Sequence, residues 1–157
     1  MNGRIVAGFI LCAALVAGGA VWYAQEVAYY HPVTPADPAA AIALTTPAGA
    51  VEPIATADFR GIDAESSPLR FRACFTTPLS LAQLGAAFAP YPGAEPRNAP
   101  RQFDCFDAAR IGADLEAGRA RAFLSRRDIH PGFDRVVVVY PDGRAYAWHQ
   151  PNASAER

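Results

Sequence analysis

The feature that most constrains this chain is an uninterrupted apolar run close to its start. Residues Ile5 to Ala24 read IVAGFILCAALVAGGAVWYA and carry no charged side chain. As an α-helix rising about 1.5 Å per residue, a run of this length covers the roughly 30 Å hydrocarbon core of a bilayer. We therefore expect one transmembrane helix over residues 5–24, preceded by a short tip of residues 1–4.

Charges on either side of this run predict its orientation. Arg4 precedes the run, whereas no arginine or lysine follows it before Arg60. Arginine and lysine are enriched in segments that stay on the cytoplasmic side. We expect a cytoplasmic N-terminus, a helix in the inner (plasma) membrane and a periplasmic remainder. A cleaved signal peptide is the alternative, because the small residues ending at Ala20 resemble a cleavage site.

Composition excludes several classes of function. The net charge is -1 and no lysine is present among the 157 residues. Nucleic-acid binding requires a clustered basic surface, so nucleic acid is not expected as a partner. Schiff-base chemistry and phosphate-binding loops of the Walker type each require a lysine. These two mechanisms are therefore excluded as well.

Proline density separates an expected linker from an expected domain. Residues 25–50 include HPVTPADPAAAIALTTPAG, in which prolines interrupt every candidate helix and central strand. We expect a Pro-rich stalk over 25–50, with a short edge strand at Ala41 to Thr45. Residues 51–157 then form one periplasmic domain, whose length suits a single small fold.

Sequence patterns beyond the stalk predict an α+β fold. Apolar and polar side chains alternate from Leu69 to Phe75, which indicates a strand. One helix is expected to begin after Thr77 as its N-cap, and a second to run from Asp107 as its N-cap to Gly118. The segments RARAFLSR, RVVVVY and RAYAWHQ indicate further strands, and a PDG turn joins the last two. We expect a small antiparallel sheet with both short helices on one face.

The cysteines of this expected domain predict a structural disulfide. Only Cys74 and Cys105 follow the apolar run, and such a pair is usually bridged in an oxidising compartment. Closing a loop of about 31 residues stabilises a fold by roughly 3.7 kcal/mol in the chain-entropy model. A redox-active pair is the alternative, which the wide spacing disfavours.

No catalytic, metal or cofactor site is expected from the sequence. His31, His130 and His149 are scattered without the spacing of metal ligands. An envelope hydrolase that uses Ser67 with His149 is the remaining enzymatic alternative. Nothing around Ser67 resembles a nucleophile elbow, so we do not expect an enzyme.

Arginines at alternate positions of two expected strands suggest a binding surface. If these strands are neighbours in the sheet, the side chains form one face for an anionic protein surface or for lipid headgroups. Separate solvated arginines, each paired with a nearby acidic residue, are the alternative. The four residues are Arg70, Arg72, Arg119 and Arg121.

Several stretches resemble a known group of proteins. IDAESSPLRFRACFTTPLSL, YPGAEPRNAP, FDCFDA, DRVVVV and DGRAYAWHQPN are similar to an uncharacterised family of short membrane-anchored proteins of alphaproteobacteria. The resemblance extends over nearly the whole chain, including the apolar run, and implies a shared architecture. Some members carry the automatic label histidine kinase, but this chain is too short for a phosphoacceptor helix and an ATP-binding domain. The resemblance implies no activity.

Three hypotheses of function follow. The first is a membrane-anchored accessory or assembly protein that acts through contacts with a protein partner in the membrane or periplasm. The second is a small periplasmic sensor or ligand-binding domain, and the third is the hydrolase. A pocket with converging polar groups would favour the second or third, whereas a flat apolar or arginine-lined surface would favour the first.

Overall fold

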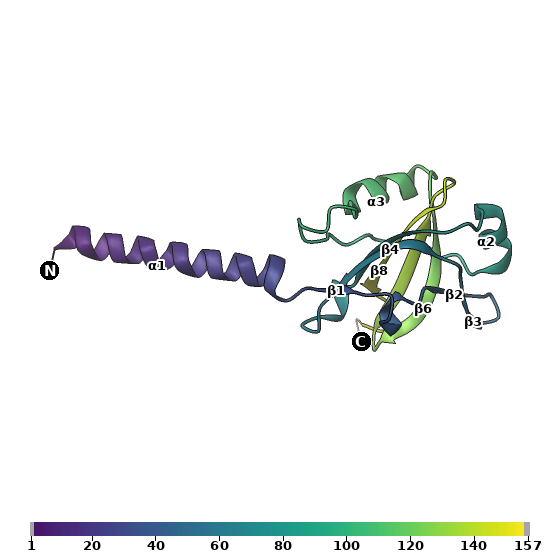
Figure 1. Ribbon diagram of the computed structural model, residues 1–157, viewed down its shortest axis with the longest axis horizontal. Helices are drawn as coiled ribbons and strands as arrows, with labels where there is room; N and C mark the ends of the chain where they lie inside the picture. Colours follow the sequence, from purple (N-terminus) through teal and green to yellow (C-terminus); the bar gives the residue numbers. More distant parts are fainter. Residues whose placement is uncertain (1, 156–157) are drawn as a thin grey trace.

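A long apolar helix leads into the folded domain. The computed structural model describes residues 2–155. Helix α1 spans Gly3–Tyr23 and continues as a π-helical turn, η1, over Ala24–Ala28. It projects away from the domain (Figure 1), and none of its residues is buried against the described chain. The helix is long and apolar enough to cross a membrane. Residue 1 of the expected tip and residues 156–157 of the expected domain lie outside the described part.

The domain is built on a six-stranded sheet in which every neighbouring pair is antiparallel. A separate two-stranded sheet consists of β2 (Ala43–Thr45) and β3 (Val51–Pro53). The expected antiparallel α+β fold is therefore confirmed. In spatial order the large sheet contains β1 (His31–Val33), β4 (Ala57–Asp63), β5 (Arg72–Thr76), β8 (Arg144–Pro151), β7 (Phe133–Val139) and β6 (Arg121–His130).

The hairpin of β7 and β8 lies inside this sheet, with β5 on one side and β6 on the other. Its turn is closed by hydrogen bonds from the Tyr140 amide to the Arg144 carbonyl (2.9 Å) and from the Gly143 amide to the Tyr140 carbonyl (3.0 Å). Gly143 has φ +85°, and a Cβ there would lie 2.7 Å from the carbonyl oxygen of Thr77. A glycine is required at this position for both reasons. The expected PDG hairpin is confirmed.

The two short helices lie on opposite faces of the sheet, so the prediction of one shared face is wrong. Helix α2 (Leu81–Ala87) packs Leu84 on the same side as Val137 and Val139. Helix α3 (Ala108–Glu116) packs Ile111 on the side of Val136 and Val138. Successive side chains of a strand point to opposite faces. Because the run Val136–Val139 is apolar at every position, both faces need a cover.

Helix boundaries agree with the sequence at α3 and differ at α2. Asp107 caps α3 by accepting a hydrogen bond from the Arg110 amide (3.0 Å), and Gly118 follows its end with φ +69°. Helix α2 begins after Ser80 and not after Thr77, because Ser80 and Gln83 form a reciprocal capping box. Thr77 instead directly follows β5, and its amide donates to the carbonyl of Gly143 in the turn between β7 and β8.

The stretch expected to be a stalk is largely part of the folded domain. β1 pairs with β4, and Val33, Ile42 and Leu44 are buried in the core. The short strand expected at 41–45 is confirmed as β2, but it packs on the large sheet through Leu44 instead of standing alone. Pro32 fits β1 because this strand lies at the edge of the sheet and has one neighbour. The linker is thus far shorter than residues 25–50.

Candidate functional site

A polar row crosses one end of the sheet, on the face that α2 covers at the other end. Arg135 in β7 and His149 in β8 are direct cross-strand partners. His31 in β1 and Asp63 in β4 are partners in the same way. Two residues further along each strand, Val137 and Ala147 belong to the apolar core. One face of the sheet therefore changes from apolar to charged along its strands.

Arg135 is the buried charge of this row. Its side chain is 5% exposed, and its guanidinium carbon lies 4.0 Å from the ring centroid of Phe71. Nε donates to Nε2 of His149 (3.0 Å) and Nη1 donates to the carbonyl of Ala39 (3.0 Å). Burial lowers the pKa of Arg135 to about 10, so the guanidinium remains charged at neutral pH.

His149 holds this guanidinium as a neutral acceptor. Because Nε2 accepts from Arg135, the ring proton must be on Nδ1, which donates to the Pro68 carbonyl (2.7 Å). The ring stacks on Phe71 with centroids 4.8 Å apart. Burial first, and then the charge of Arg135, lower the pKa of His149 to about 3. The imidazole is therefore uncharged at any physiological pH.

These contacts argue against the Ser67–His149 pair of the hydrolase hypothesis. Both ring nitrogens of His149 are already in hydrogen bonds, to Arg135 and to Pro68. The Ser67 hydroxyl caps a short 3-10 helix, η3 (Pro68–Arg70), by accepting from the Leu69 amide (3.3 Å). His149 has no free nitrogen with which to activate this hydroxyl.

The remaining donors of Arg135 face a hollow of about 480 Å³. Nη2 makes no hydrogen bond with residues 2–155, and no fully buried side-chain nitrogen or oxygen in that range lacks a partner. Nη2 is therefore not fully enclosed by these residues, and Arg135 borders the hollow. Within the same range, no carboxylate forms an ion pair with Arg135.

Asp63 and His130 border both this hollow and an adjoining one of about 340 Å³. The Asp63 side chain is half-buried, and its Oδ1 accepts from the Ala64 amide (2.8 Å). Burial raises the pKa of Asp63, against the opposing influence of that hydrogen bond and of the Arg135 charge. His31 extends the polar lining into the adjoining hollow. A cation and a carboxylate thus face one space from different strands.

A larger hollow of about 640 Å³ lies beside β6, and its chemistry is different. Apolar side chains such as Phe88 and Phe123 line it, and its charged side chains, Glu116 and Arg121, are exposed to solvent. The segment 89–91 covers the sheet edge here, since the Tyr91 amide donates to Ala122 and the Leu124 amide donates to Ala89. Converging buried polar groups are found at the Arg135 hollow, which we take as the candidate site.

Metal-ligand clusters are not found in the described chain. Across residues 2–155 no three histidine, cysteine, aspartate or glutamate side chains are placed to hold an ion together. His31 and His130 share the smaller hollow with Asp63, while His149 is occupied by Arg135 and Pro68.

The expected face of four arginines does not form. β5 and β6 are separated by β8 and β7 in the sheet, so Arg72 and Arg121 are not neighbours. Arg70 lies before β5, in η3, where its Nη1 donates to the carbonyl of Gln25 (3.2 Å). Arg119 precedes β6, and its Nε donates to Asp114 (2.6 Å).

Arg72 is buried instead of solvated. It lies on the face that α3 covers, with 4% of its side chain exposed. Its guanidinium donates to four carbonyl oxygens, those of Leu69, Phe71, Arg97 and Asn98. These bonds fasten the proline-rich loop before α3 to the start of β5. Its role is to hold the fold together.

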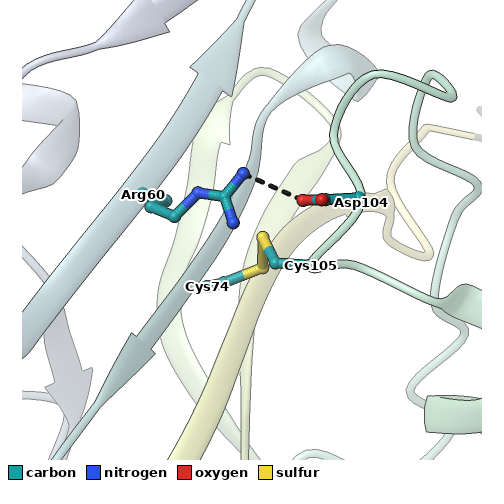
Figure 2. Close-up of a disulfide and its surroundings, with 4 residues drawn as sticks. All are labelled: Arg60, Cys74, Asp104 and Cys105. Atoms are coloured by element: carbon teal, nitrogen blue, oxygen red, sulfur yellow. Dashed lines mark hydrogen bonds and ion pairs between the residues drawn. A yellow bond between two sulfur atoms is a disulfide. The ribbon is translucent and has the colours of Figure 1, made fainter.

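The expected disulfide between Cys74 and Cys105 is confirmed. Their Cα atoms are 6.4 Å apart and the bridge closes 31 positions of sequence. Figure 2 shows the bridge joining β5 to the loop before α3, next to the ion pair of Arg60 and Asp104 (2.9 Å). The bridge and Arg72 therefore anchor the same loop to the same strand.

Sequence reasoning missed Arg135 as a site residue, although a signal was present. Asp142 is the central residue of the predicted turn, and Arg135 and His149 are equally distant from it in sequence. A hairpin with that centre makes them cross-strand partners. An arginine directly before four valines, opposite a histidine, predicts a buried polar pair at the end of the strand.

Comparison with known proteins gives one match. A family model described as "Family of unknown function (DUF6446)" matches residues 42–157. No curated protein and no solved structure matches the chain. The matched segment contains Asp63, Arg135 and His149, together with both bridged cysteines.

Proposed function

The chain belongs to this family of unknown function, and we propose that it is a membrane-anchored sensor or receptor domain that binds a small polar ligand outside the cytoplasm. One observation carries the proposal. Arg135 is buried and charged, has no carboxylate partner within residues 2–155, and opens onto a hollow. Asp63 and His130 border the same hollow.

Burial of an unpaired charge is unfavourable, and proteins normally pair such a charge or place it at a functional site. The hydrogen bond that Arg135 donates to His149 and the contact with the Phe71 ring orient the guanidinium, but no carboxylate within residues 2–155 forms an ion pair with it. A ligand that supplies negative charge would complete the site. Concave sites with a few converging polar groups are the usual form of small-molecule binding sites.

The apolar helix and the disulfide together support the proposed compartment. The apolar helix would place the N-terminus in the cytoplasm and the domain in the periplasm, where the Cys74–Cys105 bridge would persist. His31, at the border of the adjoining hollow, belongs to the first strand after the helix. Ligand binding would therefore act on the segment that leads into the membrane.

The test uses the full chain purified in a mild detergent. A library of charged and zwitterionic metabolites is screened by thermal shift on the wild type and on Arg135→Gln. We expect at least one compound to raise the melting temperature of the wild type and to leave Arg135→Gln unchanged. Identical responses of the two proteins to every compound would reject the proposal.

A second candidate, the accessory protein that acts by contact, is supported by a different observation. Arg70 lies over the rings of Tyr29 (5.8 Å) and Tyr30 (5.2 Å). The Gln102 amide group donates to the Glu26 carbonyl, which holds the loop before α3 against the end of the helix. A domain held in this way presents a fixed surface to neighbours in the membrane. Recovery of the tagged protein without companions, from membranes in several growth states, would refute this role.

A further inference from the structure

Resting on the proposed function, we infer that the Arg135 hollow takes a zwitterion of the aliphatic α-amino-acid class. The ligand carboxylate binds the guanidinium of Arg135, and the ligand ammonium group binds the carboxylate of Asp63. The aliphatic side chain lies against the apolar wall of the same hollow.

The carboxylate end of the ligand fits the free donors of Arg135. A guanidinium has five N–H donors in a planar fork, and two are taken by His149 and Ala39. The fork matches the two oxygens of a carboxylate. His149 and the Phe71 ring fix the plane of the fork before a ligand arrives, so little side-chain freedom is lost on binding.

The ammonium end fits Asp63. One carboxylate oxygen accepts from the Ala64 amide, and Oδ2 makes no hydrogen bond with any residue in the described range 2–155. The charged residues that line the hollow are Arg135, Arg126 and Asp63, so a ligand meets positive charge at one end and a carboxylate at the other. A molecule that carries both charges satisfies both groups, which favours a zwitterion.

Beside the polar residues Ser125, Arg126 and His130, the remaining lining is mostly apolar. Ile42, Val51, Pro53 and Ile129 face the hollow together with alanines 39, 41 and 43. The volume of about 480 Å³ is within the range of small-ligand sites. These side chains offer no hydrogen-bond partner for a polar substituent, so an aliphatic ligand side chain fits best.

The experiment titrates the full chain in detergent with L-leucine and two blocked analogues, by calorimetry. L-leucinamide lacks the carboxylate and N-acetyl-L-leucine lacks the ammonium group. We expect saturable binding of L-leucine, and binding weaker by about tenfold or more for each analogue, because a charged hydrogen bond is lost. Equal affinity for either analogue would overturn the inference.

Variants assign each end of the ligand to its residue. Arg135→Gln should remove the preference for L-leucine over the amide, and Asp63→Asn should remove the preference over the acetylated form. Arg121→Gln and Asp104→Asn, which change exposed side chains away from the hollow, are matched controls and should bind as the wild type does. Arg135→Lys, which keeps the positive charge, provides a second test if Arg135→Gln fails to fold.

Failure of the inference can be told apart from failure of the proposed function. If none of the twenty standard L-amino acids binds, but a metabolite from the library does and is lost in Arg135→Gln, the zwitterion is wrong and a ligand site remains. If no compound distinguishes the wild type from Arg135→Gln, both are wrong.

Discussion

Two buried arginines lie on opposite faces of one sheet and differ in what receives their hydrogen bonds. Arg72 donates to four main-chain carbonyls of the protein itself. Arg135 donates to one imidazole and one carbonyl, and its Nη2 is open to a hollow. Burial lowers the pKa of each to about 10. The two arginines are similarly buried. Arg72 has a structural role, whereas Arg135 keeps hydrogen-bond donors that a ligand can use.

The largest expected effect comes from the disulfide beside Arg72. The double replacement Cys74→Ala and Cys105→Ala should lower the free energy of unfolding by about 3.7 kcal/mol, because the unfolded chain regains loop freedom. Urea denaturation of the purified protein measures this. A loss below about 1 kcal/mol would mean that the loop before α3 is held mainly by Arg72 and the contacts of Phe103 and Phe106.

Replacement of each arginine by glutamine tests whether the two side chains differ in their contribution to stability. Arg72→Gln should lower the free energy of unfolding by about 3 kcal/mol, since buried carbonyls lose charged donors. Arg135→Gln should lower it by about 1 kcal/mol, because only two protein acceptors lose their donor. Both values come from urea denaturation without ligand. Equal losses would place Arg135 among the structural residues and remove the distinction.

The dependence of stability on pH distinguishes the two arginines, because His149 contacts Arg135. His149 has a pKa of 6.5 in the unfolded chain and about 3 in the folded protein, so the unfolded chain binds more protons between these values. Its contribution to stability is complete above pH 6.5 and decreases as the pH falls toward 3, by at most about 1.4 kcal/mol per pH unit. Asp63, whose pKa is raised on folding, opposes this decrease near the acid end.

The variant His149→Gln should therefore show a flatter dependence of unfolding free energy on pH between 6.5 and 4. Arg72→Gln should keep the slope of the wild type, because the donors of Arg72 go to carbonyl groups that do not titrate. Denaturation at several pH values compares the three proteins. The same slope in His149→Gln as in the wild type would contradict a neutral, buried His149.

The smallest effect is expected for the control substitution at Arg121. Arg121→Gln should change the free energy of unfolding by less than about 0.5 kcal/mol, since its side chain is exposed. Thermal denaturation gives this value. A large loss would show that the contacts of Arg121 beside β6 contribute more to stability than its exposed position indicates.

Local signals in the sequence predict much of this fold. The uncharged run from Ile5 to Ala24 predicts α1, Asp107 and Gly118 predict the ends of α3, and the PDG turn predicts the β7–β8 hairpin. The Cys74–Cys105 bridge was also predictable, because the chain offers no other pair beyond the helix. Each of these features depends on residues that are near in sequence or unique in the chain.

Apart from the start of α2, where the local capping box of Ser80 and Gln83 was missed, the errors concern contacts between distant segments. Val136–Val139 are apolar on both faces, so periodicity alone could not tell which face each helix covers. The order β5–β8–β7–β6 separates arginines that alternate correctly along their own strands. Both interpretations of the arginines, a binding face and separate solvated side chains, placed Arg72 at the surface, because its carbonyl partners Arg97 and Asn98 come from a loop that sequence patterns do not place.

The candidate site was also only partly predictable, because it joins segments that are distant in sequence. The register of the hairpin predicts that Arg135 pairs with His149. Asp63, in contrast, lies in β4, which pairs with the edge strand β1. The residues of β1 belong to the stretch that is predicted to be a linker because it is rich in proline. Prolines are compatible with an edge strand. The high proline content therefore led the sequence analysis to miss the part of the polar row formed by His31 and Asp63.

The central claim is that Arg135, unlike Arg72, is held ready for a ligand. The most direct measurement is native mass spectrometry of the full chain in detergent after incubation with a small-molecule cell extract. We predict one retained compound per chain in the wild type and in Arg72→Lys, and none in Arg135→Gln. The same spectrum for all three proteins, with or without a retained compound, would contradict the claim.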